Sequence, residues 1–198
     1  MAELAERAGI SAGVFNVIIG DDARGIGEVL TQHPDVAKFT FTGSTNVGKT
    51  LISQCASTVK KVSMELGGNA PFIVFDDADI DAAVQGAVIS KYRNAGQTCV
   101  CTNRIYVQRN VLDEFTEKFI KAVSKLTIGN GMDEGTDIGP MISSEAVDNV
   151  DNLVQEAIEA GAKVVLGGQR DKTTNTFYQP TVIIDVTNGM SVVKNEIF

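Results

Sequence analysis

Short apolar runs alternate along this chain with segments whose apolar residues recur at helical spacing. This alternation constrains the fold more than any other feature of the sequence. A run of consecutive apolar residues is typical of a buried strand, whereas recurrence every three to four residues is typical of a helix that packs on a sheet. A strand that is followed by a helix and a second strand usually returns parallel to the first. The sequence therefore predicts an α/β fold, a mostly parallel sheet with helices on its faces.

The expected elements follow one another in a regular order. Strands are expected at residues 14–19, 36–41, 59–66, 72–75, 103–108, 164–166 and 181–184. Helices are expected at residues 23–33, 45–57, 79–91, 112–126 and 143–160, with a glycine-rich loop at 128–140. We place a domain boundary at Gly67 and Gly68, because a double glycine provides a hinge between two α/β units. The first half has too few strands for a complete doubly wound nucleotide-binding domain.

Composition excludes several classes of function. The formal net charge of −8 and the pI near 4.7 argue against nucleic acid or an anionic membrane surface as partner. No apolar run approaches the ~20 residues that a membrane helix needs. Three cysteines (Cys55, Cys99 and Cys101) do not make a disulfide framework, which favours a reducing, cytoplasmic compartment.

Three segments contain residues that can carry chemistry. A strand that leads through Gly43 and Ser44 into a helix can direct N–H groups at a phosphate, although a simple turn and helix cap explain it as well. A carboxylate at Glu65, beside two glycines, becomes a general base if it is desolvated; the alternative is a solvated strand end. Cys99 lies in a turn of small polar residues, where an exposed thiolate can attack a carbonyl; the alternative is a buried, inert thiol. The single histidine, His33, lies in a polar turn, which disfavours both a Cys/His hydrolase and a zinc site.

Together these motifs resemble the signatures of the aldehyde dehydrogenase superfamily. The matching segments are Phe41-Thr-Gly-Ser-Thr, Met64-Glu-Leu-Gly-Gly-Asn, Gly96-Gln-Thr-Cys99 and Asn195-Glu-Ile-Phe, and their order and spacing fit the family without a gap. The resemblance implies an internal fragment of a longer protein. Residues 1–66 would be the C-terminal part of a Rossmann-type NAD(P)-binding domain. Residues 67–198 would be a thiol-bearing α/β catalytic domain that is incomplete at its C-terminus.

The resemblance also assigns roles to individual residues. Cys99 would attack the aldehyde to give a thiohemiacetal, and hydride transfer to NAD or NADP would leave a thioester on the sulfur. Glu65 would activate the water that hydrolyses this thioester. The cofactor would be bound by Gly43 and Ser44 at the diphosphate, the Leu66 carbonyl at the nicotinamide, Glu196 at a ribose and Phe198 beside the nicotinamide ring. No metal is expected.

Within the superfamily, the segment from Lys91 to Arg104 is most similar to the succinate-semialdehyde dehydrogenases. In that subfamily the arginine six residues before the nucleophile helps to hold the substrate carboxylate, which gives this role to Arg93. The alternative for Arg93 is a helix C-terminal residue favoured by the helix dipole. Some members carry a redox-sensitive Cys-x-Cys, so Cys101 would form a strained, easily reduced disulfide with Cys99. Otherwise Cys101 packs behind the loop.

The expected function is NAD(P)-dependent oxidation of a small aldehyde that bears a carboxylate, in the first place succinate semialdehyde to succinate. The resemblance implies a homodimer or homotetramer for the full-length parent and little activity for the fragment alone. Two alternatives stay open: an aldehyde dehydrogenase of other substrate range, and a truncated, non-catalytic fragment. The preference between NAD and NADP and the exact semialdehyde are not decided by these residues.

Overall fold

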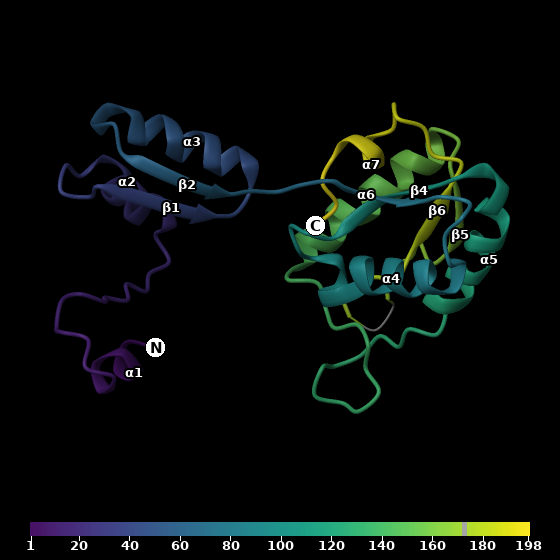
Figure 1. Cartoon of the computed structure of the whole chain (residues 1–198), viewed down its shortest axis with the longest axis horizontal. Helices are drawn as coiled ribbons and strands as arrows, with labels where there is room; N and C mark the ends of the chain where they lie inside the picture. Colours follow the sequence, from purple (N-terminus) through teal and green to yellow (C-terminus); the bar gives the residue numbers. More distant parts are fainter. Residues whose placement is uncertain (172–173) are drawn as a thin grey trace. The chain divides into compact units, whose positions relative to one another are not determined.

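The computed structural model describes residues 1–171 and 174–198, and it divides the chain into two compact units, Met1–Leu66 and Gly67–Phe198. Figure 1 shows that each unit combines helices with paired strands. The expected α/β class is confirmed. Among the described residues, none of the helices has both the length and the apolar character of a membrane span.

The first unit is built on a pair of parallel strands. β1 (Lys38–Thr42) pairs with β2 (Lys61–Glu65), and Thr42 lies beside Glu65 in the register. The remaining elements of this unit are α1 (Ala2–Arg7), α2 (Ala23–Gln32), α3 (Thr45–Cys55) and the 3₁₀ turn η1 (Ala56–Thr58). The fully buried Thr31 joins α2 to α3, because its Oγ1 bonds the Gly27 carbonyl at 2.7 Å and the Gln54 side chain at 3.0 Å.

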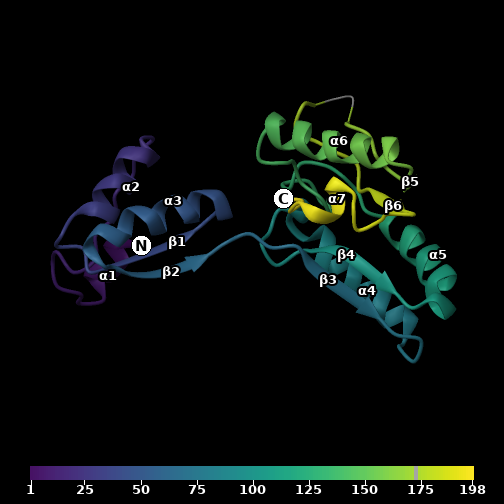
Figure 2. The ribbon, with the colours of Figure 1, turned by 90° about the horizontal axis from the view of Figure 1, so that it is seen from above.

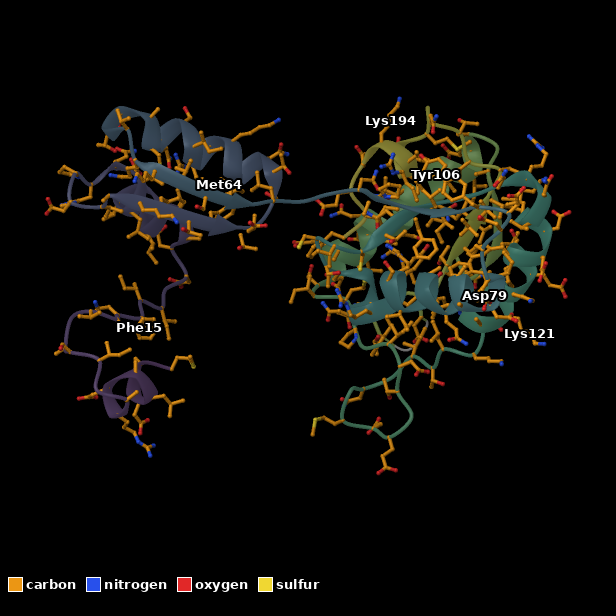
Figure 3. All side chains as sticks on the ribbon, viewed as in Figure 1. Phe15, Met64, Asp79, Tyr106, Lys121 and Lys194 are labelled. Carbon is orange, nitrogen blue, oxygen red and sulfur yellow. The ribbon has the colours of Figure 1, made fainter. Side chains whose placement is uncertain are left out.

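The strand expected at residues 14–19 is wrong. These residues form no strand in the described part of the chain, and the side chains of Val14, Ile18 and Ile19 are 73%, 72% and 92% exposed. Figure 3 shows Phe15 on a segment that stands apart from β1 and β2. An apolar run favours burial, but a strand also needs a neighbouring strand to pair its backbone N–H and C=O groups. The helix α1 was not expected either.

The second unit contains one parallel and one antiparallel strand pair among its described residues. β3 (Ala70–Val74) runs parallel to β4 (Thr102–Val107), and β5 (Lys163–Leu166) runs antiparallel to β6 (Val182–Ile184). The expectation of parallel pairing therefore holds for β1–β2 and β3–β4 but not for β5–β6. The helical elements are α4 (Ile80–Tyr92), η2 (Arg93–Gly96), η3 (Arg109–Val111), α5 (Leu112–Val123), α6 (Ser144–Glu159) and α7 (Ser191–Lys194).

The core of the second unit lies where α4 and α5 pack together on β3 and β4 (Figure 2). Phe115 and Phe119 stack with ring centroids 5.5 Å apart, and the Tyr92 ring lies 6.2 Å from that of Phe119. The Tyr92 hydroxyl donates to the Thr181 carbonyl at 2.9 Å. At the other end of α4, the Asp79 side chain (labelled in Figure 3) caps the helix by accepting from the Ala82 N–H. These contacts fix the helix from which the cysteine-bearing loop departs.

Truncation of this core has a defined cost. The substitution Phe119→Ala should lower the free energy of unfolding by about 3–5 kcal/mol, because it removes a buried ring and leaves a cavity. Denaturant unfolding of the 198-residue chain measures this loss. Ile89 lies in α4 but is 67% exposed, and Ile89→Ala should change the value by less than about 0.5 kcal/mol. Equal losses in the two variants would contradict the assignment of the core.

Candidate active site

The turn between β1 and α3 is suited to an anion. The Gly43 N–H donates to the Glu65 carbonyl at 3.0 Å, and the Ser44 hydroxyl caps α3 by accepting from the Val47 N–H at 3.4 Å. Within residues 1–171 and 174–198, the N–H groups of Thr45 and Asn46 have no hydrogen-bond partner. Unpaired N–H groups at a helix N-terminus bind phosphate. The N–H groups beside Ser44 are therefore the ones at this turn that could hold a phosphate, whereas the N–H of Gly43 is already bonded to Glu65.

Close packing fixes the end of β2 beside this turn. A Cβ atom at Gly48 would lie 2.5 Å from Leu66 Cδ2, so the Leu66 side chain rests directly on α3. A Cβ atom at Gly43 would lie 2.4 Å from the Phe41 ring. Parallel pairing brings the carboxyl ends of β1 and β2 to one edge of the sheet, and Glu65 therefore shares that edge with the turn. The Glu65 side chain is exposed there, as a solvated strand end would be.

Cys99 lies in a loop whose backbone is held in an uncommon conformation. Asn94, Ala95 and Gly96 have φ angles of 54°, 56° and 78°, which is a run of three left-handed residues. Residues other than glycine adopt this region only when the surrounding structure holds them in it. The loop that follows leaves Cys99 exposed and buries Cys101, which is 1% exposed. The two thiols therefore have different environments although one residue separates them.

Cys101 is held from several sides beneath the loop. Its Sγ lies 2.7 Å from Thr98 Oγ1 and donates to the Lys91 carbonyl at 3.6 Å. The Lys91 ammonium donates to Asn103 Oδ1 at 2.8 Å; burial lowers the pKa of Lys91, and the charge interaction with Cys101 opposes that shift. The thiol packs behind the loop in this conformation. A Cys99–Cys101 disulfide stays a prediction, and it would require Cys101 to leave these partners.

The second unit also brings Glu196 to the segment that begins it. Glu196 Oε1 accepts from the Gly68 N–H at 3.1 Å, and a Cβ atom at Gly67 would lie 1.8 Å from Glu196 Oε2. A Cβ atom at Gly68 would in turn lie 3.4 Å from the Cys99 carbonyl oxygen. Sequence reasoning treated this double glycine as a hinge. The structure adds that Gly67 receives the Glu196 carboxylate at a distance that a Cβ atom would obstruct, whereas the Cys99 backbone lies in ordinary contact with Gly68.

Arg93 and Phe198 occupy the surface of the second unit. Arg93 is the first residue of η2, directly after α4, and its side chain is exposed. Phe198 is 53% exposed and lines, with Tyr106 and Ile197, the wall of a cavity of about 960 Å³. The structure thus places Gly43, Ser44, Glu65 and Leu66 in the first unit, and Arg93, Cys99, Cys101, Glu196 and Phe198 in the second.

The fold and these residues define a class of protein, an α/β protein with a serine-capped helix N-terminus after a parallel strand in one unit and an exposed thiol in the other. The model of the aldehyde dehydrogenase family matches residues 1–198, and the chain belongs to this family. It is 59% identical to 3-sulfolactaldehyde dehydrogenase of Pseudomonas putida. It is 56% identical to an NADP(+) succinate-semialdehyde dehydrogenase of Escherichia coli and 56% identical to a glutarate-semialdehyde dehydrogenase of Pseudomonas aeruginosa. These matches cover all of this chain but 40%, 41% and 41% of the relatives, so the chain spans about 40% of their length.

Solved structures agree with this assignment. A succinate-semialdehyde dehydrogenase from Burkholderia pseudomallei matches with a TM-score of 0.95 at 52% identity, over 99% of this chain and 40% of that one. A betaine aldehyde dehydrogenase from Staphylococcus aureus, solved in complex with NAD+, matches with a TM-score of 0.91 at 36% identity, over 99% of this chain and 39% of that one. The expected aldehyde dehydrogenase-like fold is confirmed, as is the similarity to succinate-semialdehyde dehydrogenases.

The exposure of the three thiols predicts their relative reactivity. Cys99 should react with iodoacetamide at least about tenfold faster than Cys55 and Cys101, because the reagent reaches an exposed thiol directly and reaches a buried thiol only after local opening. Cys55 and Cys101 are only 2% and 1% exposed. A time course of peptide mass mapping on the 198-residue chain measures the three rates. Cys99→Ala should remove the fast phase, and equal labelling of all three thiols would show that the loop does not present Cys99.

Proposed function

We propose that the whole protein oxidises a small aldehyde bearing an acidic group to the corresponding acid, with NAD or NADP as the hydride acceptor. The observation that carries the proposal is the exposed Cys99 at the end of a left-handed turn, in a chain of the aldehyde dehydrogenase family. We assign the first unit to the cofactor domain and the second to the catalytic domain. We also place the protein in the cytoplasm, as a homodimer or homotetramer.

The chemistry begins at the sulfur of Cys99. Its thiolate attacks the carbonyl carbon to give a thiohemiacetal, and the Cys99 N–H donates a hydrogen bond to the developing oxyanion. The bound nicotinamide cofactor supplies the acceptor for the hydride that leaves this carbon. The product on the sulfur is a thioester. Glu65 takes a proton from a water molecule, and the resulting hydroxide adds to the thioester carbonyl, releasing the acid and the thiolate.

Several residues support binding of the cofactor. The N–H groups of Thr45 and Asn46 and the capped Ser44 offer a place for a diphosphate. The Glu196 carboxylate lies against the backbone of Gly67 and Gly68, and Gly68 in turn lies beside the Cys99 carbonyl. This carboxylate can accept a hydrogen bond from a ribose hydroxyl of the cofactor. We assign the Leu66 carbonyl and the Phe198 ring to the nicotinamide, and Gly43 to the turn that brings the diphosphate near.

The proposal that the substrate bears an acidic group is supported by the names of the relatives. Succinate and glutarate semialdehydes carry a carboxylate, and 3-sulfolactaldehyde carries a sulfonate, as the names of those enzymes indicate. The exposed guanidinium of Arg93 can bind either anion with two parallel hydrogen bonds and so orient the aldehyde toward Cys99. We propose succinate semialdehyde as the substrate. The 59% identity to the sulfolactaldehyde enzyme makes that sulfonate the second candidate.

The substitution Arg93→Ala separates this binding role from a structural one. It should lower kcat/KM of the whole protein for succinate semialdehyde by about 10²-fold, the effect of one charge-assisted bidentate contact. The value for butanal, an uncharged aldehyde of equal chain length, should change by less than about threefold. Arg109 provides a matched control, because it is also exposed and also begins a 3₁₀ turn. Cofactor reduction measures the rates.

The outcomes of this comparison decide the substrate class. Equal loss for both aldehydes in Arg93→Ala would contradict an anion-binding role for this residue. Faster oxidation of 3-sulfolactaldehyde than of succinate semialdehyde would move the assignment to the sulfonate. Lack of cofactor reduction with any aldehyde would overturn the enzyme proposal and favour a non-catalytic chain.

The substitution Glu65→Gln tests the hydrolytic step. A glutamine amide cannot take a proton from water, so steady turnover should fall at least about 10²-fold, whereas the acyl-enzyme should still form. Pre-steady-state kinetics of the whole protein should then show a burst of reduced cofactor equal to the Cys99 content. Glu28→Gln, at another exposed glutamate of the first unit, should behave as wild type. Unchanged steady turnover in Glu65→Gln would remove Glu65 from the mechanism.

A further inference from the structure

The side-chain amide of Gln97 joins two loops of the second unit. Its Oε1 accepts from the Ile142 N–H at 2.8 Å, and its Nε2 donates to the Pro140 carbonyl at 3.4 Å and the Asn94 carbonyl at 3.3 Å. Asn94 begins the left-handed run before Cys99, whereas Pro140 and Ile142 belong to the loop that precedes α6. One side chain therefore bridges two segments that lie more than forty positions apart in the sequence.

The left-handed turn needs such an attachment. Asn94 and Ala95 hold positive φ angles that side-chain-bearing residues rarely adopt. The turn is closed internally, because Asn94 Nδ2 donates to the Gln97 carbonyl at 3.0 Å and the Gln97 N–H donates to the Asn94 carbonyl at 3.1 Å. These two bonds define the shape of the turn, and Ala95 packs against both hydrophobic clusters of the unit. The Gln97 side chain adds hydrogen bonds that link the turn to the segment at residues 138–142.

That neighbouring segment is fixed to the interior of the unit. Ile138 and Met141, on either side of Pro140, are 4% and 8% exposed and belong to two hydrophobic clusters. The Met141 N–H also donates to the Thr176 carbonyl at 2.8 Å. The segment at residues 138–142 is therefore a fixed support, and the Gln97 amide bonds to it on both sides of Met141.

We propose that Gln97 is a positioning residue, which anchors the left-handed turn at Asn94–Gly96 to the core and thereby keeps Cys99 outward and Cys101 covered. Gln97 acts through the loop backbone and not on the thiol. The catalytic consequence rests on the proposed function, whereas the placement of the two thiols does not. Loss of the amide should free the loop and uncover the sulfur beneath it.

The rate at which iodoacetamide alkylates Cys101 in the 198-residue chain measures directly how far the loop has been freed. A methionine side chain has nearly the length of glutamine but neither the donor nor the acceptor. Gln97→Met should raise the rate of Cys101 alkylation by iodoacetamide at least about tenfold. The Ile142 amide should also exchange its hydrogen at least about tenfold faster. Cys55, buried in the first unit, should keep its wild-type alkylation rate.

A matched variant distinguishes positioning from general destabilisation. The Gln108 side chain also bonds to backbone in the second unit, since its Oε1 accepts from the Asp76 N–H at 2.8 Å; Gln108→Met should leave Cys101 protected. Unchanged Cys101 protection in Gln97→Met would overturn the proposal, and equal deprotection in Gln108→Met would overturn it as well.

The whole protein supplies the catalytic readout. Gln97→Met should lower kcat about tenfold at unchanged KM for the cofactor, because a displaced thiol affects the chemical step and not nucleotide binding. If the wild-type protein had no dehydrogenase activity, the proposed function would be contradicted. The alkylation rates of Cys101 would still test whether Gln97 positions the loop. A Cys101 that becomes reactive while kcat stays at the wild-type value would overturn the catalytic part of this proposal.

Discussion

The left-handed run at Asn94–Gly96 is the constraint on which the candidate site of the second unit depends. The chain must leave the packed helix α4 at Tyr92 and enter the parallel strand β4 at Thr102, and both ends are fixed by buried contacts. The loop that follows the positive φ angles leaves Cys99 and Val100 exposed, and the chain returns to the interior at Cys101, directly before β4. The turn closed by the Cys101 N–H on the Thr98 carbonyl therefore separates an exposed Cys99 from a buried Cys101. The contacts around this loop hold its uncommon backbone angles, and Cys99 is exposed in the conformation that they maintain.

Parallel pairing organises the first unit in a comparable way. The register that sets Thr42 beside Glu65 brings the N-terminus of α3 and the carboxylate of Glu65 to the same edge of the sheet. The Gly43 N–H reinforces this arrangement by bonding the Glu65 carbonyl, and Leu66 packs on Gly48. In the second unit, the residues after Leu66 receive Glu196 and the backbone of Cys99. At Gly48 and Gly67 a Cβ atom would occupy the space of the neighbouring Leu66 and Glu196 side chains, so glycine permits these two close approaches.

Sequence periodicity anticipated most helices and strands, including α3 to α6 and β1 to β6, with ends displaced by a few residues. It failed at residues 14–19, where an apolar run has no strand beside it, and it did not anticipate the short helices α1 and α7. The first failure concerns pairing, and the partners of a strand lie outside the window that periodicity examines. The motifs at Gly43, Glu65 and Cys99 were recognised from residue type and spacing. The importance of Gln97 was not, because its three side-chain bonds are made to backbone groups that carry no sequence signal.

The sequence by itself determined the α/β class, the family and the identity of the residues with chemical capacity, because these depend on local periodicity and on motifs contained in short segments. The tertiary structure decided which thiol faces solvent, that the Gly43 N–H bonds the Glu65 carbonyl, and where the Glu196 carboxylate rests. Each of these depends on contacts between distant residues, such as Gly68 with Glu196 and Gln97 with Ile142. The type of a residue determines which groups it can bind, but its exposure and its hydrogen-bond partners are fixed only when the chain has folded.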